Sequence, residues 1–153
     1  MTRRRKDDTG RRILVFGSPY WSSRKLTVDA LQRVMEVYRP TYTLVCDMTD
    51  GAARYAAAVA RELGWQVEVH EFDVTKCGPD CPTRNHRRKS QQGDWCPSAR
   101  LRNQEAMADL GADVCIALGY GVPPSGVRRD GTKEIKARGI GVWEYTQPGA
   151  ARR

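Results

Sequence analysis

The stretch TLVCDMTDGAARYAAAVARELG, residues 43–64, sets the expectations for the whole chain. The apolar run 43–46 predicts a short buried strand, and the polar residues 47–50 predict a turn. Gly51 then opens an alanine-rich helix that ends at Gly64. A strand that turns sharply into a helix leaves the first helical N–H groups unpaired, and with the helix dipole these groups form an anion site. The pattern fits an ordinary strand–helix turn equally well, and this stretch alone leaves both interpretations open.

The rest of the chain repeats the alternation of strand and helix. Continuous apolar strands that alternate with helices indicate an α/β fold, here a Rossmann-like three-layer sandwich with a mostly parallel sheet of about five strands. Ser98 is the expected N-cap of the third helix. The other expected strands are 12–16, 66–70, 114–118 and 140–143, and the other expected helices are 24–38, 98–110 and 131–138.

Length and composition indicate the number of domains and the cellular location. With 153 residues, 40% of them hydrophobic, the chain is expected to form one globular domain. We expect a basic disordered tail at residues 1–11, a single domain at 12–145 with a Cys/His-rich insert at 73–97, and a tail at 146–153. No apolar run approaches the roughly 20 residues that span a membrane, and the first residues lack the apolar core of a signal peptide. We therefore expect a cytoplasmic protein without a membrane partner.

The formal net charge of +8 favours an anionic partner, either nucleic acid or a phosphorylated small molecule. For residues 1–11 a disordered, solubilising tail is the preferred interpretation. The charge inside the chain falls in segments that carry other signals. These internal basic residues are Arg84, Arg87, Arg88, Lys89, Arg100, Arg102, Arg128, Arg129, Lys133, Lys136 and Arg138.

The predicted topology narrows the ligand site to three loops. In open parallel sheets, ligands bind beyond the carboxyl ends of the strands near the topological switch point. The loops expected there are 17–21, 47–51 and 119–132, and all three contain glycine.

These loops, with the third helix, resemble the SLOG superfamily, a Rossmann-like nucleotide-binding group that includes YspA- and YpsA-related proteins. The resemblance covers about residues 12–143 and depends on the order of several features rather than on one motif. These features are Gly17-Ser18 after the first strand, Gly51-Ala52 at the second helix, Arg102-Asn103 and Met107 on the third helix, Gly111-Ala112-Asp113 before the fourth strand, and Gly131-Thr132 before Gly139-Ile140.

The resemblance implies a nucleotide-derived ligand at the switch point. Close backbone approach would come from the first loop, phosphate contacts from the second helix and the last loop, and polar side chains from the third helix. The implied ligand-binding residues are Gly17, Ser18, Thr49, Asp50, Gly51, Ala52, Arg102, Asn103, Gly131 and Thr132.

The chain also departs from the superfamily at the second loop. Asp47 and Met48 stand where relatives often carry glycines, and Ala53 stands where they often carry an aspartate. Of the Pro-Gly-Gly-x-Gly-Thr-x-x-Glu loop of the phosphoribohydrolase relatives, only Gly131-Thr132 is retained. The carboxylates of Asp47 and Asp50 would repel phosphate unless they bind a ribose hydroxyl or face away.

The polar insert carries a second signal. Cys77, Cys81, His86 and Cys96 present three thiols and an imidazole within twenty residues, a ligand set that zinc takes in closed structural sites. The segment has few apolar residues, so a bound metal would supply its ordering energy. The alternative is a flexible loop with free thiols. Cys46 and Cys115 lie in apolar strands and are expected in the core.

Three functions remain open from the sequence. The first is binding or sensing of a nucleotide-derived ligand beside a structural zinc loop. The second is a nucleotide hydrolase or phosphoribohydrolase-like enzyme, whose candidate carboxylates are Asp47, Asp50 and Glu134. The third is nucleic-acid binding through the basic zinc loop, with Trp95, Trp21 and Tyr20 to stack on bases. Self-association into a homo-oligomer is left open.

Overall fold

The computed structural model describes residues 10–39, 41–49, 51–78, 81, 88–90, 93–96, 98–119 and 132–147. Several expectations fall outside these residues: the sites at Asp50, His86 and Gly131, most of the loop 119–132, and both tails apart from their inner ends.

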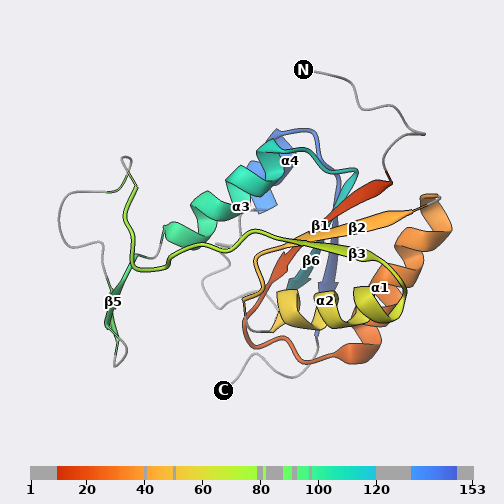
Figure 1. Ribbon diagram of the computed structural model, residues 1–153, viewed down its shortest axis with the longest axis horizontal. Coiled ribbons are helices and arrows are strands. Elements are labelled where there is room, and N and C mark those ends of the chain that lie inside the picture. Colours follow the sequence, from red (N-terminus) through yellow and green to blue (C-terminus); the bar gives the residue numbers. More distant parts are fainter. Residues whose placement is uncertain are drawn as a thin grey trace.

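Strands and helices alternate along the chain (Figure 1). The main sheet contains five strands, and four helices connect or flank them within the described residues. The elements are β1 (Arg11–Gly17), α1 (Arg24–Val37), β2 (Tyr42–Cys46), α2 (Ala52–Glu62), β3 (Gln66–Val69), β4 (Arg88–Ser90), β5 (Gly93–Trp95), α3 (Ala99–Asp109), β6 (Val114–Gly119), α4 (Thr132–Ala137) and β7 (Val142–Thr146).

The main sheet is parallel throughout, with the strand order β3-β2-β1-β6-β7. In the centre, Ile13 of β1 pairs with Leu44 of β2 on one side and with Val114 of β6 on the other. The chain moves outward from β1 to β3 and then returns to the opposite side of β1. The order therefore reverses between β1 and β6, which is the switch point of a doubly wound sheet. This confirms the expected α/β fold class.

Helices cover both faces of the sheet and make it the middle of three layers (Figure 1). Successive side chains of a strand point to opposite faces. Ile13 and Val15 thus join a core formed with α1 and α2, whereas Leu14 and Phe16 join a second core with α3 and α4. Among the described residues, no helix is long and apolar enough to cross a membrane.

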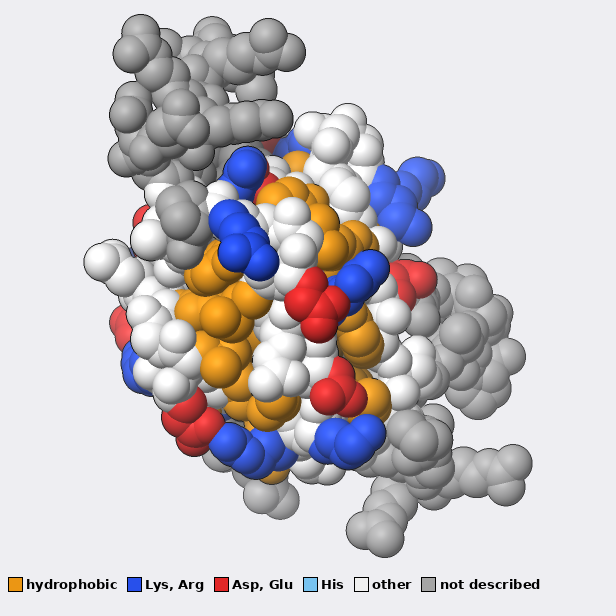
Figure 2. Space-filling model, turned by 90° about the vertical axis from the view of Figure 1, so that its right-hand side faces the viewer, with side chains coloured by type: hydrophobic (Ala, Val, Ile, Leu, Met, Phe, Trp, Pro, Cys, Tyr) orange, Lys and Arg blue, Asp and Glu red, His pale blue; other side chains and the backbone are white. Residues whose placement is uncertain are grey.

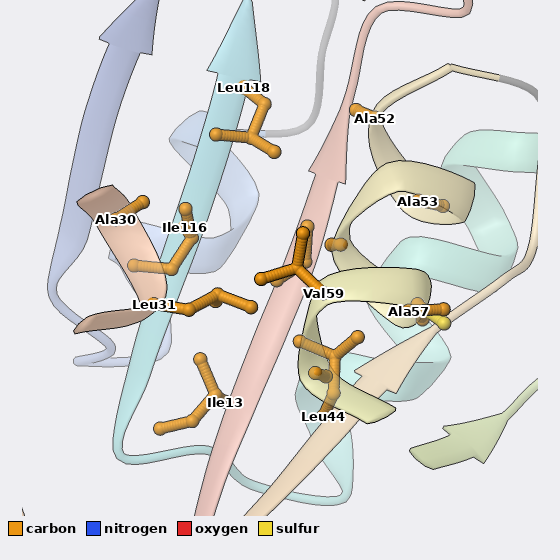
Figure 3. Packing of buried hydrophobic residues seen from close by; sticks show 14 of the residues in the cluster. Ile13, Ala30, Leu31, Leu44, Ala52, Ala53, Ala57, Val59, Ile116 and Leu118 are labelled. Atoms are coloured by element: carbon orange, nitrogen blue, oxygen red, sulfur yellow. The ribbon is translucent and has the colours of Figure 1, made fainter. Parts of the chain in front are cut away.

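The alanines of α2 allow this helix to lie close to the sheet. Ala52, Ala53, Ala56, Ala57 and Ala60 are all fully buried. Figure 3 shows this side of α2 turned toward the strands, with Val59 and Leu44 between the helix and the sheet. Small side chains bring the start of α2 against the loop that follows β1, and this close approach shapes the candidate site.

Three details differ from the expectations. Ser98 precedes α3 but makes no side-chain cap, because its φ of −89° and ψ of −10° are helical rather than extended. The last strand, β7, begins at Val142, two positions after the expected start, and pairs with β6 as far as Thr146. The insert contains a short antiparallel hairpin of β4 and β5, which lies apart from the main sheet in Figure 1.

A polar network joins β1 to β3 across β2. The Arg12 guanidinium donates to both carboxylate oxygens of Glu68 at 2.9 and 2.6 Å, and His70 Nε2 lies 2.7 Å from Glu68 Oε2. Hydrogen bonding from Arg12, opposed by partial burial and supported by His70, lowers the pKa of Glu68 from 4.5 to about 2. A carboxyl group whose pKa is lower in the folded state stabilises the fold above its unfolded pKa.

Acid is therefore expected to remove the contribution of Glu68 as the pH falls from about 4.5 to about 2. Because the Glu68 side chain is 38% exposed, solvent screening reduces the effect, and we expect a loss of about 1 kcal/mol. Chemical denaturation at pH 5 and pH 2.5 measures it. Between these two pH values, the free energy of unfolding of Glu68→Gln should change less than that of the unmodified chain, by this amount. Glu36→Gln, which alters an exposed pair with Arg33, should show the same change as the unmodified chain. Equal pH dependence in both variants would contradict the assignment.

Candidate ligand and metal sites

The loop after β1 lies directly on the start of α2. The Ser18 N–H donates to the Leu118 carbonyl at 2.9 Å, and the Ser18 carbonyl accepts from the N–H groups of Ala52 at 3.0 Å and Trp21 at 3.2 Å. The Ser18 hydroxyl oxygen accepts from the Tyr20 N–H at 3.0 Å. The first N–H of α2 is thus used inside the protein.

Gly51 makes this arrangement possible. Its φ is +82°, and a side-chain carbon at this position would lie 2.4 Å from the carbonyl oxygens of Ser18 and Pro19. Gly17 is equally confined, since a Cβ there would lie 2.0 Å from the Leu118 carbonyl oxygen. Both glycines serve close approach between protein segments. Their predicted part in ligand binding, together with that of Ser18 and Ala52, stays a prediction.

A charged network occupies the carboxyl end of β2. The Asp47 side chain is completely buried, and its Oδ1 accepts from Thr49 Oγ1 at 2.8 Å and from the Thr49 N–H at 3.0 Å. Asp47 Oδ2 lies 3.5 Å from Arg100 Nε, and neither atom has a hydrogen-bond partner among the described residues. Arg100 Nη2 donates to the Gly17 carbonyl at 2.6 Å and to Thr49 Oγ1 at 3.1 Å.

Arg100 therefore connects the first turn of α3 to the loops after β1 and β2. The Asp47 carboxylate does not reach solvent. The Arg100 guanidinium compensates its negative charge. In the sequence, Arg100 stands out only as one of the internal basic residues. The signal that could have found it is its place in the first turn of a helix that starts at the same edge of the sheet as the two loops.

The structure corrects the expected position of Arg102. Its Nη1 donates to Cys81 Sγ at 2.9 Å and its Nη2 to the Lys76 carbonyl at 2.9 Å, so it lies at the cysteines rather than at the loops after β1 and β2. Asn103 Nδ2 donates to the His70 carbonyl at 2.8 Å, beyond the end of β3. Each helical residue turns the side-chain direction by about 100°, so Arg102 points about 200° away from Arg100. Asn103 lies on the same face as Arg100 but about one turn further along α3.

Three cysteines come together beside α3. The sulphur atoms of Cys77, Cys81 and Cys96 lie within 4.8 Å of one another, and none forms a disulfide. The sulphurs of Cys81 and Cys96 are 3.5 Å apart, far beyond the roughly 2.05 Å of a disulfide and near the roughly 3.8 Å between two thiolates on one tetrahedral zinc. The Gly78 N–H also donates to Cys81 Sγ at 3.3 Å. These residues can hold a metal ion, as the sequence predicted for all three.

Arg102 supplies a positive charge to this cluster. Burial acts to lower its pKa, but hydrogen bonds to Cys96 and Cys81 outweigh that effect and raise it. The guanidinium thus stays charged beside sulphur atoms that must be thiolates to bind a metal. Cys46 and Cys115 are fully buried in the core as expected, and burial raises the pKa of Cys46.

A pocket opens at the carboxyl ends of β2 and β3, and Asp47 is one of its lining residues. Met48 has a φ of +59°, and no other non-glycine residue in the described part of the chain has a positive φ. Such a conformation costs about 1 kcal/mol or more and is concentrated at functional sites. The pocket is lined by Asp47, Met48, Thr49, Arg54, Val69, Glu71, Phe72 and Val74.

Several of the described basic residues are paired with acids. Arg11, Arg12, Arg24, Arg33, Arg100 and Arg138 each form an ion pair with an aspartate or a glutamate. On the face in Figure 2, Lys and Arg side chains alternate with Asp and Glu and with hydrophobic patches. Thr132 is buried at the start of α4, and the loop before it lies outside the described residues.

Fold and site together define a Rossmann-like α/β protein with a three-cysteine cluster beside the carboxyl edge of its sheet. No protein-family model and no solved structure matches the chain. A curated relative, the "Gene 61 protein" of Mycobacterium phage D29, is 34% identical over 115 residues, which cover 72% of this chain and 78% of the relative. The chain belongs to the family of this phage protein.

Proposed function

We propose that the protein binds a nucleotide-derived ligand at the carboxyl ends of its parallel strands and that it is a member of the SLOG superfamily. The motifs Gly17-Ser18 and Gly51-Ala52 support this membership, because both lie at the carboxyl edge of the sheet in a Rossmann-like strand order. Doubly wound sheets bind their ligands at this edge.

One observation carries the proposal. Arg100 crosses from α3 to Gly17, Thr49 and the buried Asp47, and so joins the edges of two of the three predicted loops. An ion pair with buried, incompletely satisfied atoms is costly, and a functional role is one of the explanations for such unsatisfied groups. The neutralised Asp47 also removes the objection that its charge would repel a phosphate.

Binding is favoured over hydrolysis. A catalytic carboxylate must reach the scissile bond or its water. Asp47 Oδ1 is held by Thr49 and Oδ2 faces Arg100, and the side chain has no solvent exposure. Glu134 lies in the first turn of α4, and Asp50 lies outside the described residues.

We also infer that the metal of the cysteine cluster is zinc and that His86 is its fourth ligand. Three thiolates and a neutral imidazole complete a closed tetrahedral site, whose role is structural because no position is left for water. With Zn²⁺ this set carries a charge of about −1, and the Arg102 guanidinium offsets it.

Thermal unfolding in the presence of nucleotides tests the ligand proposal. We expect AMP, ADP or ADP-ribose, at about 100 times the dissociation constant, to raise Tm by roughly 5–10 °C. Arg54→Ala, at the pocket, should reduce the shift, because it removes a positive charge near a bound phosphate. Arg61→Ala is the matched control, an exposed arginine in the last turn of the same helix.

DNA and RNA oligonucleotides form the contrasting arm of this experiment. Salt-sensitive oligonucleotide binding with no Tm shift from any nucleotide would contradict the proposal and favour a nucleic-acid-binding protein. Release of free base or phosphate during incubation would favour the hydrolase.

A further inference from the structure

We propose that the pocket beyond β2 and β3 is a slot for a nucleobase that carries an exocyclic amino group. The inference rests on the proposed function and names the part of the ligand that this pocket takes. The pocket is also lined by Val69, Phe72 and Val74. These residues lie outside the three ligand loops predicted from the sequence, which are 17–21, 47–51 and 119–132.

The pocket has the size and the apolar walls that a flat ring requires. Its volume is about 770 Å³, within the range of roughly 300–1,000 Å³ that small-molecule sites occupy. Val69 and Val74 are 37% and 41% exposed, and both line this pocket together with Phe72 and Met48. Exposed apolar side chains that converge on one concave site indicate a ligand surface that would cover them.

The backbone of the slot is held in an unfavourable conformation by its neighbours. Met48 keeps its positive φ while its carbonyl accepts from Arg54 Nε at 3.3 Å. This bond also holds the Arg54 guanidinium at the edge of the pocket, where it would contact a phosphate attached to the bound nucleoside. A residue in a sparsely populated backbone conformation at the wall of a pocket is consistent with a binding site there.

The polar groups of the pocket select the chemistry of the ring. Glu71 is exposed at the pocket and its carboxylate, when ionised, only accepts hydrogen bonds. Asp47 also lines the pocket, but its side chain is buried and its Oδ2 faces Arg100, so the selection depends on Glu71. The amino group of a ring can donate a hydrogen bond to a carboxylate. A ring carbonyl in the same place would face the carboxylate with a second acceptor, and no hydrogen bond could form.

Adenosine and inosine test this selection, because they differ at the ring position where an amino group is replaced by a carbonyl. Titration calorimetry on the metal-loaded full chain should give adenosine an affinity roughly tenfold above that of inosine, since the hydrogen bond to a charged acceptor is lost. Glu71→Gln should bring the two affinities close together, because an amide both donates and accepts. AMP measured beside adenosine separates recognition of the ring from recognition of the phosphate.

Filling the slot provides the second arm. Val74→Trp should abolish adenosine binding, because the indole occupies the space of the ring. Val37→Trp is the control, since Val37 is 47% exposed at the end of α1 and lies outside the pocket lining.

The outcomes separate this inference from the proposed function. If nucleotides bind both tryptophan variants equally, or if inosine binds as tightly as adenosine to the unmodified chain, the nucleobase slot is wrong and the proposed function stands. If no nucleoside or nucleotide binds the unmodified chain, both are wrong.

Discussion

Arg100→Met is expected to lower the free energy of unfolding by about 2 kcal/mol, less than a fully buried ion pair would give, because the Arg100 side chain is 28% exposed. The variant removes the positive charge 3.5 Å from Asp47 Oδ2 and leaves a fully buried carboxylate whose Oδ1 accepts from Thr49. Arg100 Nη2 also stops donating to the Gly17 carbonyl, so the loops after β1 and β2 lose their connection to α3. Urea denaturation measures the change.

Two further variants make this expectation specific. Arg33→Met removes an arginine from an exposed ion pair with Glu36 and should change the stability by at most about 0.5 kcal/mol. The double variant Arg100→Met/Asp47→Asn should recover part of the loss, because the uncompensated charge is gone. If the double variant is as unstable as the sum of the two single variants, Arg100 acts through packing and the charge argument is wrong.

Loss of the metal is expected to have the second large effect. Cys96→Ser should reduce zinc, measured by mass spectrometry, from about one ion per chain to near zero, because a closed site needs all of its ligands. Cys96 is fully buried and its N–H donates to the Val74 carbonyl at 2.7 Å, so the metal centre is tied to the segment after β3. Chelation should therefore expose residues 71–81 to protease while the main sheet stays folded.

Cys115→Ala is the matched control for this experiment. Cys115 is as deeply buried as Cys96 but lies in β6, away from the cluster, so this variant should keep its zinc. If the chelated protein has the same cleavage pattern and the same Tm as the metal-loaded protein, the metal has no structural role.

The local part of the fold was predictable because its causes are local. The apolar runs of β1, β2 and β6 and the helical spacing of α1 are properties of consecutive residues, and the elements lie where the sequence predicted them to within a few positions. Ser98 shows the limit of such reasoning. Its residue type favours a cap, but the chain path set by the preceding Cys96 gives it helical dihedral angles, and no side-chain cap forms.

The candidate site was predictable in part for a related reason. Parallel strands bring their carboxyl ends to one edge, so the sequence indicated that the loops 17–21 and 47–51 lie near each other, without the contacts between them. It also assigned Arg102 to the ligand, whereas Arg102 contacts Cys81 and Arg100 takes the position between the loops. Two residues of one helical turn differ by about 200° in direction, and the resemblance alone offered no means of deciding which of them faces the loops.

The sequence by itself determined the alternation of strands and helices, the core positions of Cys46 and Cys115, and the three cysteines as candidate metal ligands. Tertiary structure alone decided that Arg100 neutralises Asp47, that Arg102 lies at the thiols, and that Val69, Phe72 and Val74 form a pocket with Met48. Arg100 and Thr49 are 51 residues apart, and Arg100 and Gly17 are 83 apart. Residue spacing encodes the direction of a side chain within its own element, whereas the partner it meets depends on how the elements pack.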